Sequence, residues 1–180
     1  MHLLFSTTER FTLLESLVFK TGRLSVNHVA SQLHLSKGLV SKYVDLLIKE
    51  GLAKRVNGKF IINESSDVVK GVRLLLNVKR IPSALFKKYP FVQGAGLYGS
   101  CAKGENTEDS DVDLWIRIGK ASDEQLAAFT AALRRHIERV NLLFLTDKKL
   151  AQLKREDELF YHALSFGSLV LYGASYGLEL

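Results

Sequence analysis

The stretch GSCAKGENTEDSDVD at residues 99–113 decides how the second half of the chain folds and which chemistry it can carry. A Gly-Ser turn precedes a polar loop and two aspartates, Asp111 and Asp113, spaced two residues apart. Because side chains at positions i and i+2 of an extended chain share a face, both carboxylates are expected to converge. Adjacent carboxylates repel each other unless a cation lies between them. Such oxygen ligands suit Mg²⁺ with a phosphate-bearing substrate, which favours metal-assisted transfer from a nucleoside triphosphate (NTP).

Short apolar segments flank this stretch. Residues 95–98 and 113–118 are rich in aliphatic and aromatic side chains, which predicts two strands joined by the polar loop. Gly99 lets the backbone approach a phosphate closely, and the Ser100 hydroxyl and neighbouring N–H groups can donate to phosphate oxygens. The alternative is a plain hairpin whose acidic side chains are solvated. The complete string, in its strand–loop–strand context, favours the nucleotide site.

The order of these residues resembles the signature of the polymerase-β-like nucleotidyltransferase superfamily, in which Gly-Ser is followed after ten residues by Asp-x-Asp. It is most similar to the minimal nucleotidyltransferase (MNT) branch, with the pattern GS-x-A-[RK]-G followed by SD-[IV]-DL. The matching positions are Gly99, Ser100, Ala102, Lys103, Gly104, Ser110, Asp111, Asp113 and Leu114. The resemblance covers about residues 82–175. It implies an α+β domain with a small mixed sheet and flanking helices.

The same resemblance assigns roles to particular residues. Asp111 and Asp113 would be the catalytic, metal-binding aspartates, and Gly99 and Ser100 would contact phosphates. A basic residue near the nucleotide corresponds to Lys103, whose alternative role is that of an exposed loop lysine. The implied cofactor is Mg²⁺, with a two-metal site as one form, and the implied substrate is an NTP.

The family's third carboxylate is replaced in this chain. It should lie on the strand predicted at residues 139–146, where the matching residue is Asn141. An amide oxygen can ligate a metal, so Asn141 is the third candidate ligand, but it brings no negative charge and cannot accept a proton as a carboxylate can. Glu138 precedes the strand and Asp147 follows it, so neither has the right phase.

Other segments of the second half predict helices and one further strand. The helices are expected at residues 83–89, 124–139 and 150–164, and the last strand at residues 169–173.

Charge is distributed unevenly along the chain. Residues 1–80 carry 13 Lys and Arg against 6 Asp and Glu, whereas residues 81–180 carry 12 against 13. A basic half joined to a near-neutral half favours a nucleic-acid-binding module attached to another domain.

The basic half has the pattern of a winged helix-turn-helix. Helices are predicted from Thr7 or Thr8 to about residue 20, after Ser25 to about residue 33, and after Ser36 to about residue 50. Strands at residues 52–56 and 59–62 are joined by Asn57-Gly58, the strongest two-residue hairpin signal.

Residues 29–43 resemble the winged-helix domains of many prokaryotic regulators, in which the third helix enters the major groove. DNA is therefore the expected partner, with RNA and protein as alternatives. The basic side chains could also be solvated surface charges that bind no partner. The residues expected to contact DNA are Ser36, Lys37, Ser41, Lys42, Arg55 and Lys59.

These patterns give three segments: a winged helix-turn-helix domain at residues 1–64, a linker helix at residues 65–81 and a nucleotidyltransferase domain at residues 82–180. The linker helix could be a connector or a dimer seam, and regulators of this kind raise the expectation of a homodimer. The apolar runs are too short to span a bilayer, and the first residues are too few for a signal peptide. With a single cysteine, Cys101, a reducing cytoplasmic location is expected.

Two hypotheses from different classes follow. In the first, the protein is an enzyme that transfers a nucleotidyl group to an acceptor; by the resemblance, this acceptor could be a small molecule or a hydroxyl of a partner toxin of the HEPN class. In the second, it is a DNA-binding regulator or antitoxin-like protein whose transferase domain has lost turnover because of Asn141.

Overall fold

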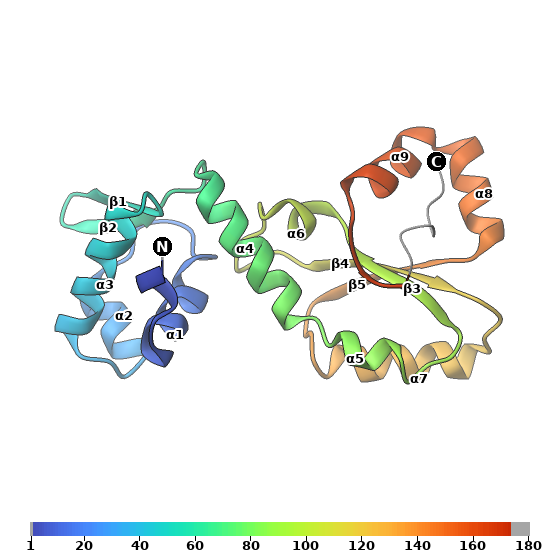
Figure 1. Ribbon diagram of the computed structural model, residues 1–180, viewed down its shortest axis with the longest axis horizontal. Helices are drawn as coiled ribbons and strands as arrows, with labels where there is room; N and C mark the ends of the chain where they lie inside the picture. Colours follow the sequence, from blue (N-terminus) through green and yellow to red (C-terminus); the bar gives the residue numbers. More distant parts are fainter. Residues whose placement is uncertain (1, 174–180) are drawn as a thin grey trace. The chain divides into compact units, whose positions relative to one another are not determined.

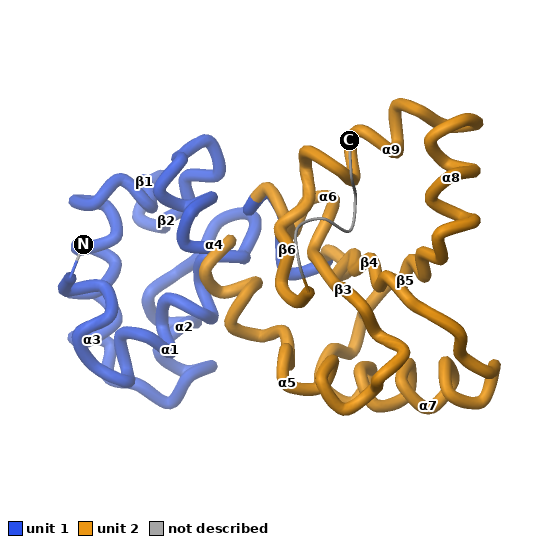
Figure 2. Tube along the Cα trace, turned by 45° about the vertical axis from the view of Figure 1, so that its right-hand side comes forward, with its two compact units in different colours: residues 1–73, 104–109 blue, residues 74–103, 110–180 orange. Residues whose placement is uncertain are grey.

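The computed structural model describes residues 2–173 and contains two compact units (Figure 1). The first unit consists of the chain up to Arg73 together with Gly104–Asp109, and the second consists of Leu74–Lys103 and the chain from Ser110 onward. Helix α4, Asp67–Arg80, passes from the first unit into the second. Figure 2 shows that residues 104–109 share the colour of the first unit, although both of their ends continue into the second.

The first unit is built of helices followed by a two-stranded hairpin. Its elements are η1 (His2–Phe5), α1 (Thr8–Leu17), α2 (Val26–Gln32), α3 (Lys37–Lys49), β1 (Ala53–Val56), β2 (Lys59–Ile62) and the start of α4. Leu24 forms an isolated bridge to Phe60 and so adds one residue to the small antiparallel sheet.

Local sequence explains where these elements begin and turn. Thr7, Ser25 and Ser36 each accept a hydrogen bond from the backbone N–H three residues later, which satisfies a donor that the helix leaves unpaired. Asn57 (φ 49°) and Gly58 (φ 74°) both have positive φ, as the tight hairpin between β1 and β2 requires. The three helix starts and the hairpin turn predicted from the sequence are thereby confirmed.

A buried arginine connects α4 to the end of α1 within the first unit. Arg73 is 1% exposed, and its Nε donates to the carbonyl oxygen of Val18 at 2.9 Å. Its guanidinium carbon lies 6.0 Å from the centre of the Phe19 ring, within the range of a cation–π contact. Burial lowers the pKa of Arg73 from its usual value.

The second unit contains a mixed four-stranded sheet in the order β5-β4-β3-β6. Its strands are β3 (Val92–Leu97), β4 (Val112–Ile118), β5 (Val140–Leu145) and β6 (Leu169–Tyr172). Strand β3 is antiparallel to both β4 and β6, whereas β4 and β5 run parallel. The expected α+β domain with a mixed sheet is confirmed.

Helices cover both faces of this sheet (Figure 1). They are α5 (Ser83–Phe86), α6 (Gly99–Lys103), α7 (Asp123–Arg134), α8 (Asp147–Glu156) and α9 (Glu158–Gly167). One face buries Leu114 and Ile116 in a cluster with Phe86 and Phe129, and the opposite face buries Trp115 with Leu145 and Leu164. The alternation along β4 follows from the two-residue period of a strand.

The helices of the second unit differ from the predicted boundaries. The segment predicted as one helix at residues 150–164 is two helices, because Asp157 has extended φ and accepts a hydrogen bond from Phe160 N at 3.1 Å, which starts α9. Helix α7 ends at Arg134 rather than near residue 139, and Ile137 is buried beyond its end. The helix predicted at residues 83–89 spans only Ser83–Phe86, and a short helix, α6, occupies part of the predicted loop.

Within residues 2–173, none of the helices combines the length and the apolar character that a membrane crossing would require.

Gly96 provides a test of packing on the face that holds Trp115. A Cβ at Gly96 would lie 2.6 Å from the indole ring, whereas a Cβ at Gly94 on the same strand would lie at an ordinary 3.4 Å. We expect Gly96→Ala to lower the free energy of unfolding of the second unit by about 1–3 kcal/mol through overpacking. Gly94→Ala should change it far less. Urea unfolding followed by the fluorescence of Trp115 measures both, and equal effects would contradict the packing.

Candidate functional site

Two aspartates and an asparagine meet where β4 and β5 begin. Asp113 is in β4, Asp111 lies just before it, and the parallel register places Asp113 opposite Asn141 of β5. Asn141 Nδ2 donates to Asp111 Oδ2 at 3.3 Å and to Asp113 Oδ1 at 3.2 Å. The convergence predicted from the i, i+2 spacing is present, and the amide of Asn141 lies against both carboxylates.

The start of α6 lies directly beside this cluster. Gly99 has φ +66°, and a Cβ there would be only 2.7 Å from Asp113 Oδ2. Both the conformation and the space therefore demand glycine at this position. Tyr98 N donates to the carbonyl oxygen of Asp113 at 3.1 Å, so the backbone just before Gly99 is held against β4. Ser100, the next residue, is half-buried in the first turn of α6.

Lys103 occupies the last position of α6, and its side chain is exposed. It is thus on the same short helix as Gly99 and Ser100, one turn further along. This position agrees equally with a contact to a bound nucleotide and with a solvated lysine.

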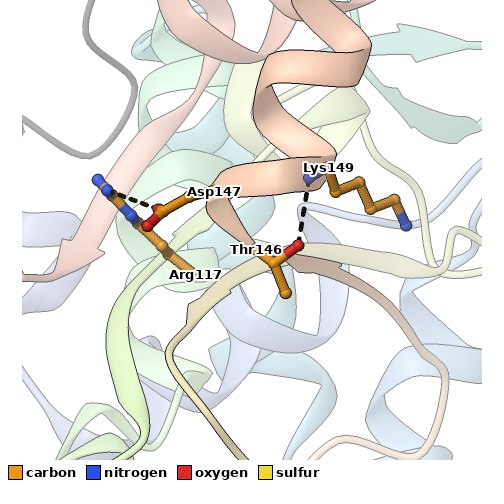
Figure 3. Close-up of polar contacts among 4 residues, drawn as sticks. All are labelled: Arg117, Thr146, Asp147 and Lys149. Atoms are coloured by element: carbon orange, nitrogen blue, oxygen red, sulfur yellow. Dashed lines mark hydrogen bonds and ion pairs between the residues drawn. The ribbon is translucent and has the colours of Figure 1, made fainter.

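Neither of the nearby acidic residues takes the place of the third carboxylate. Glu138 is exposed and precedes β5, and Asp147 begins α8 after β5 has ended. Figure 3 shows the Asp147 carboxylate paired with Arg117 Nη2 at 3.0 Å, next to Thr146, which caps α8 by accepting from Lys149 N at 3.2 Å. Among the described residues, no group of three or more His, Cys, Asp or Glu side chains could hold a metal ion.

The donor set nevertheless fits a Mg²⁺ ion that arrives with its substrate. Mg²⁺ is commonly bound through one or two carboxylates together with substrate phosphates and water. Asp111 and Asp113 supply the carboxylates. The side chain of Asn141, whose Nδ2 donates to both carboxylates, also carries an amide oxygen that can bind a metal ion. A second ion would have to share the same two carboxylates, because the position of a third is held by Asn141.

Burial around the cluster changes the acidity of two side chains. It is the main cause that raises the pKa of Tyr98, and the charge of Asp113 raises it further. It also raises the pKa of the fully buried Cys101 thiol, with the Arg80 charge opposing. Both groups therefore keep their protons at neutral pH, and the Cys101 thiol donates to the carbonyl oxygen of Asp111.

The residues expected to contact DNA lie on α3 and on the two strands of the hairpin in the first unit. Ser36 caps α3 and accepts from Leu39 N at 3.2 Å, and Lys37, Ser41 and Lys42 follow on that helix. Arg55 is in β1 and Lys59 in β2. The Arg55 guanidinium pairs with Asp45 of α3, a contact between the hairpin and the helix that no local sequence pattern predicts.

Sequence reasoning also missed two residues that contact the site from α4. Asn77 and Arg80 form hydrogen bonds with Cys101 of α6, and Cys101 in turn contacts Asp111. Both lie in the segment predicted as a linker helix. No motif or spacing in a single sequence marks them, because their role depends on tertiary contacts.

Residues 83–173 match the family model described as polymerase beta, nucleotidyltransferase, and the chain belongs to that family. The predicted resemblance is confirmed at this level. Among solved structures, the chain is similar to a crystal structure of a mutant of the toxin-antitoxin MntA-HpeT, with 15% identity, 53% of this chain and 73% of that chain covered, and a TM-score of 0.40. No curated protein matches the chain.

Asn141 gives a test of the electrostatics of the site. Asn141→Asp removes two donated hydrogen bonds and adds a third negative charge, so without metal we expect a loss of stability of about 1 kcal/mol or more. Millimolar Mg²⁺ should then raise the melting temperature of this variant more than that of the wild type, because the ion binds the folded state. Thermal unfolding with Mg²⁺ and with EDTA measures both effects.

Asn141→Ala is the matched control, since it removes the same hydrogen bonds without adding charge. An equal response to Mg²⁺ in the Asp and Ala variants would contradict a cation site at this cluster.

Proposed function

We propose that the protein binds Mg·NTP at the cluster of Asp111, Asp113 and Asn141 and transfers a nucleotidyl group to a hydroxyl acceptor. The observation that carries this proposal is the convergence of both carboxylates on one side chain, with the backbone of Gly99 close against Asp113. Family membership supports a transferase of this class.

Each residue has a role in this proposal. Asp111 and Asp113 hold Mg²⁺, and Asn141 can present its amide oxygen as a third ligand. The backbone of Gly99 and the hydroxyl of Ser100 bind phosphate oxygens, and Lys103 supplies positive charge from the end of α6. When bound, Mg²⁺ neutralises charge on the phosphates and polarises the phosphoryl oxygen. In the transfer, the acceptor oxygen forms a bond to the α-phosphorus, the bond from that phosphorus to the bridging oxygen breaks, pyrophosphate leaves with the electron pair, and the acceptor's proton passes to solvent.

A second function is favoured by Asn141 alone. Its amide cannot take the proton of an attacking hydroxyl, and it already satisfies both carboxylates as a donor. In this alternative, the protein binds nucleotide without efficient turnover and acts as a DNA-binding regulator or antitoxin-like protein. By family resemblance, a HEPN-type toxin would be the partner, and its hydroxyl would be the acceptor if turnover persists.

We further propose that the first unit is a winged helix that binds DNA in the cytoplasm, with a homodimer as its working form. The order of α1, α2, α3 and the β1–β2 hairpin supports this assignment. Helix α3 carries exposed Lys37 and Lys42 near its start, as a helix that enters the major groove should. The excess of basic residues in this part of the chain supplies attraction to phosphates.

Calorimetric titration with ATP, GTP, CTP and UTP tests the nucleotide site without knowledge of the acceptor. We expect at least one NTP to bind in a Mg²⁺-dependent manner, and the Asp111→Asn/Asp113→Asn variant to lose at least about tenfold in affinity, or 1.4 kcal/mol. The double variant removes both charges while its amides keep the size of the carboxylates. Absence of Mg²⁺-dependent binding in folded wild-type protein would overturn the proposed function.

Pyrophosphate release then separates the two candidate functions. Release by the wild type, abolished in the double variant, supports the transferase. Mg·NTP binding without release, with release restored by Asn141→Asp, supports the catalytically impaired regulator.

DNA binding has a test of its own. Lys42→Glu should weaken binding, and the slope of log affinity against log salt should fall by about 1 for a lost phosphate contact. Lys87→Glu, an equal charge change at an exposed residue of the second unit, is the control and should leave the slope nearly unchanged. Fluorescence anisotropy with a labelled duplex over a range of salt concentrations measures both. Affinity that is insensitive to salt would contradict phosphate-driven binding by α3.

A further inference from the structure

The second half of α4 contributes two polar side chains to the region of the candidate site. Asn77 is fully buried, and its Nδ2 donates to the carbonyl oxygen of Cys101 at 2.8 Å. Cys101 is in the middle of α6, a helix too short to pair its own last carbonyl groups. A buried amide on this carbonyl fixes α6 against α4, since a buried polar group without a partner is costly.

Arg80, one turn further along α4, reaches the side chain of the same cysteine. Its Nη2 donates to Cys101 Sγ at 3.3 Å, and the thiol donates to the carbonyl oxygen of Asp111 at 3.4 Å. Cys101 is fully buried, whereas Arg80 is exposed and reaches the thiol from the surface. A chain of contacts therefore runs from Arg80 through the thiol to the backbone of the first aspartate of the pair.

These contacts join two parts of the site that the sequence separates. Gly99 and Ser100 begin α6, whereas Asp111 lies beyond residues 104–109, a loop that belongs to the first unit. Within the second unit, the thiol of Cys101 is a direct contact between α6 and Asp111. On the other side, Val112 N donates to the carbonyl oxygen of Arg139 at 2.9 Å, so the backbone at this point is held from two directions.

We propose that Asn77 and Arg80 are positioning residues for the nucleotide site, and that they act through Cys101 to fix α6 and the backbone of Asp111 at one spacing. This inference rests on the proposed function, because it concerns the same site. Neither residue touches the reacting atoms. Mg·NTP would contact the phosphate-binding backbone and the two carboxylates at the same time. A shift of one relative to the other would therefore weaken its binding.

Two matched pairs of variants test the proposal. Arg80→Met removes the guanidinium and keeps an extended side chain, and Lys79→Met makes the same charge change at the adjacent exposed residue. Cys101→Ala removes the thiol, and Cys101→Ser keeps a donor of similar size. We expect Arg80→Met and Cys101→Ala to weaken Mg²⁺-dependent NTP binding at least about fivefold, and the two control variants to change it less than about twofold.

Calorimetry supplies the affinities, and thermal unfolding shows whether an effect is only a loss of stability. Equal NTP affinities within each pair, or affinities that simply follow the melting temperatures, would overturn the positioning role. Asn77→Ala is only a supporting variant, because Asn77 is fully buried and the loss of its hydrogen bond can prevent folding.

Hydrogen exchange keeps this inference separate from the proposed function. If the wild-type protein binds no NTP, the proposed function is wrong. The exchange rate of the Val112 amide then still shows whether Arg80 fixes the backbone next to Asp111. Faster exchange at Val112 in Arg80→Met than in Lys79→Met supports the positioning role, and equal rates overturn it.

Discussion

The close approach of Gly99 to Asp113 is the constraint on which the candidate site depends. No side chain fits between the backbone of Gly99 and the Asp113 carboxylate, and the positive φ of Gly99 turns the chain out of β3 and into α6 at that point. The antiparallel pairing of β3 with β4 and the parallel pairing of β4 with β5 then place Asp113 between Gly99 and Asn141. The phosphate-binding and metal-binding candidates are neighbours because three adjacent strands are in register.

Asn141 changes the electrostatic character of this arrangement. A third carboxylate at this position would add repulsion to an existing pair, and the site would need a cation to be stable. The neutral amide instead donates to both aspartates, so the cluster is satisfied without metal. With Asn141 in place of a carboxylate, the site also lacks the group best suited to accept a proton from a hydroxyl. Stability of the metal-free site and ease of proton removal are therefore opposed at a single residue.

Much of the fold follows from local chemistry that one sequence displays. The Ser and Thr caps, the Asn57-Gly58 turn and the alternation along β4 depend on residues a few positions apart, and each was predictable. The convergence of Asp111 and Asp113 was predictable for the same reason. The pairing of Asn141 with Asp113 was reached through family resemblance, because the register of two distant strands has no local signal.

What the sequence did not predict depends on contacts between distant segments. Helix α6 is short enough to be mistaken for a loop, and it is held by Asn77 from another helix. The break between α8 and α9 turns on Asp157, which is an acceptable residue inside a helix and becomes a cap only because its backbone is extended. Arg73 and Asn77 lie in the segment predicted as a linker helix, and both are buried and donate to main-chain carbonyl groups.

Residues 104–109 lie inside the family signature but make their contacts with the first unit. Gly104 has φ +68°, and a Cβ there would lie 2.2 Å from the carbonyl oxygen of Lys70 in the first unit. Glu108 N donates to the carbonyl oxygen of Phe19 at 2.9 Å, its carboxylate pairs with Lys20, and Glu105 pairs with Lys70 at 3.3 Å. Gly104, Glu105 and Glu108 therefore make contacts within the first unit, the unit to which residues 104–109 belong (Figure 2). A polar loop inside a nucleotide-binding signature is thus not, by its composition alone, a nucleotide-binding loop.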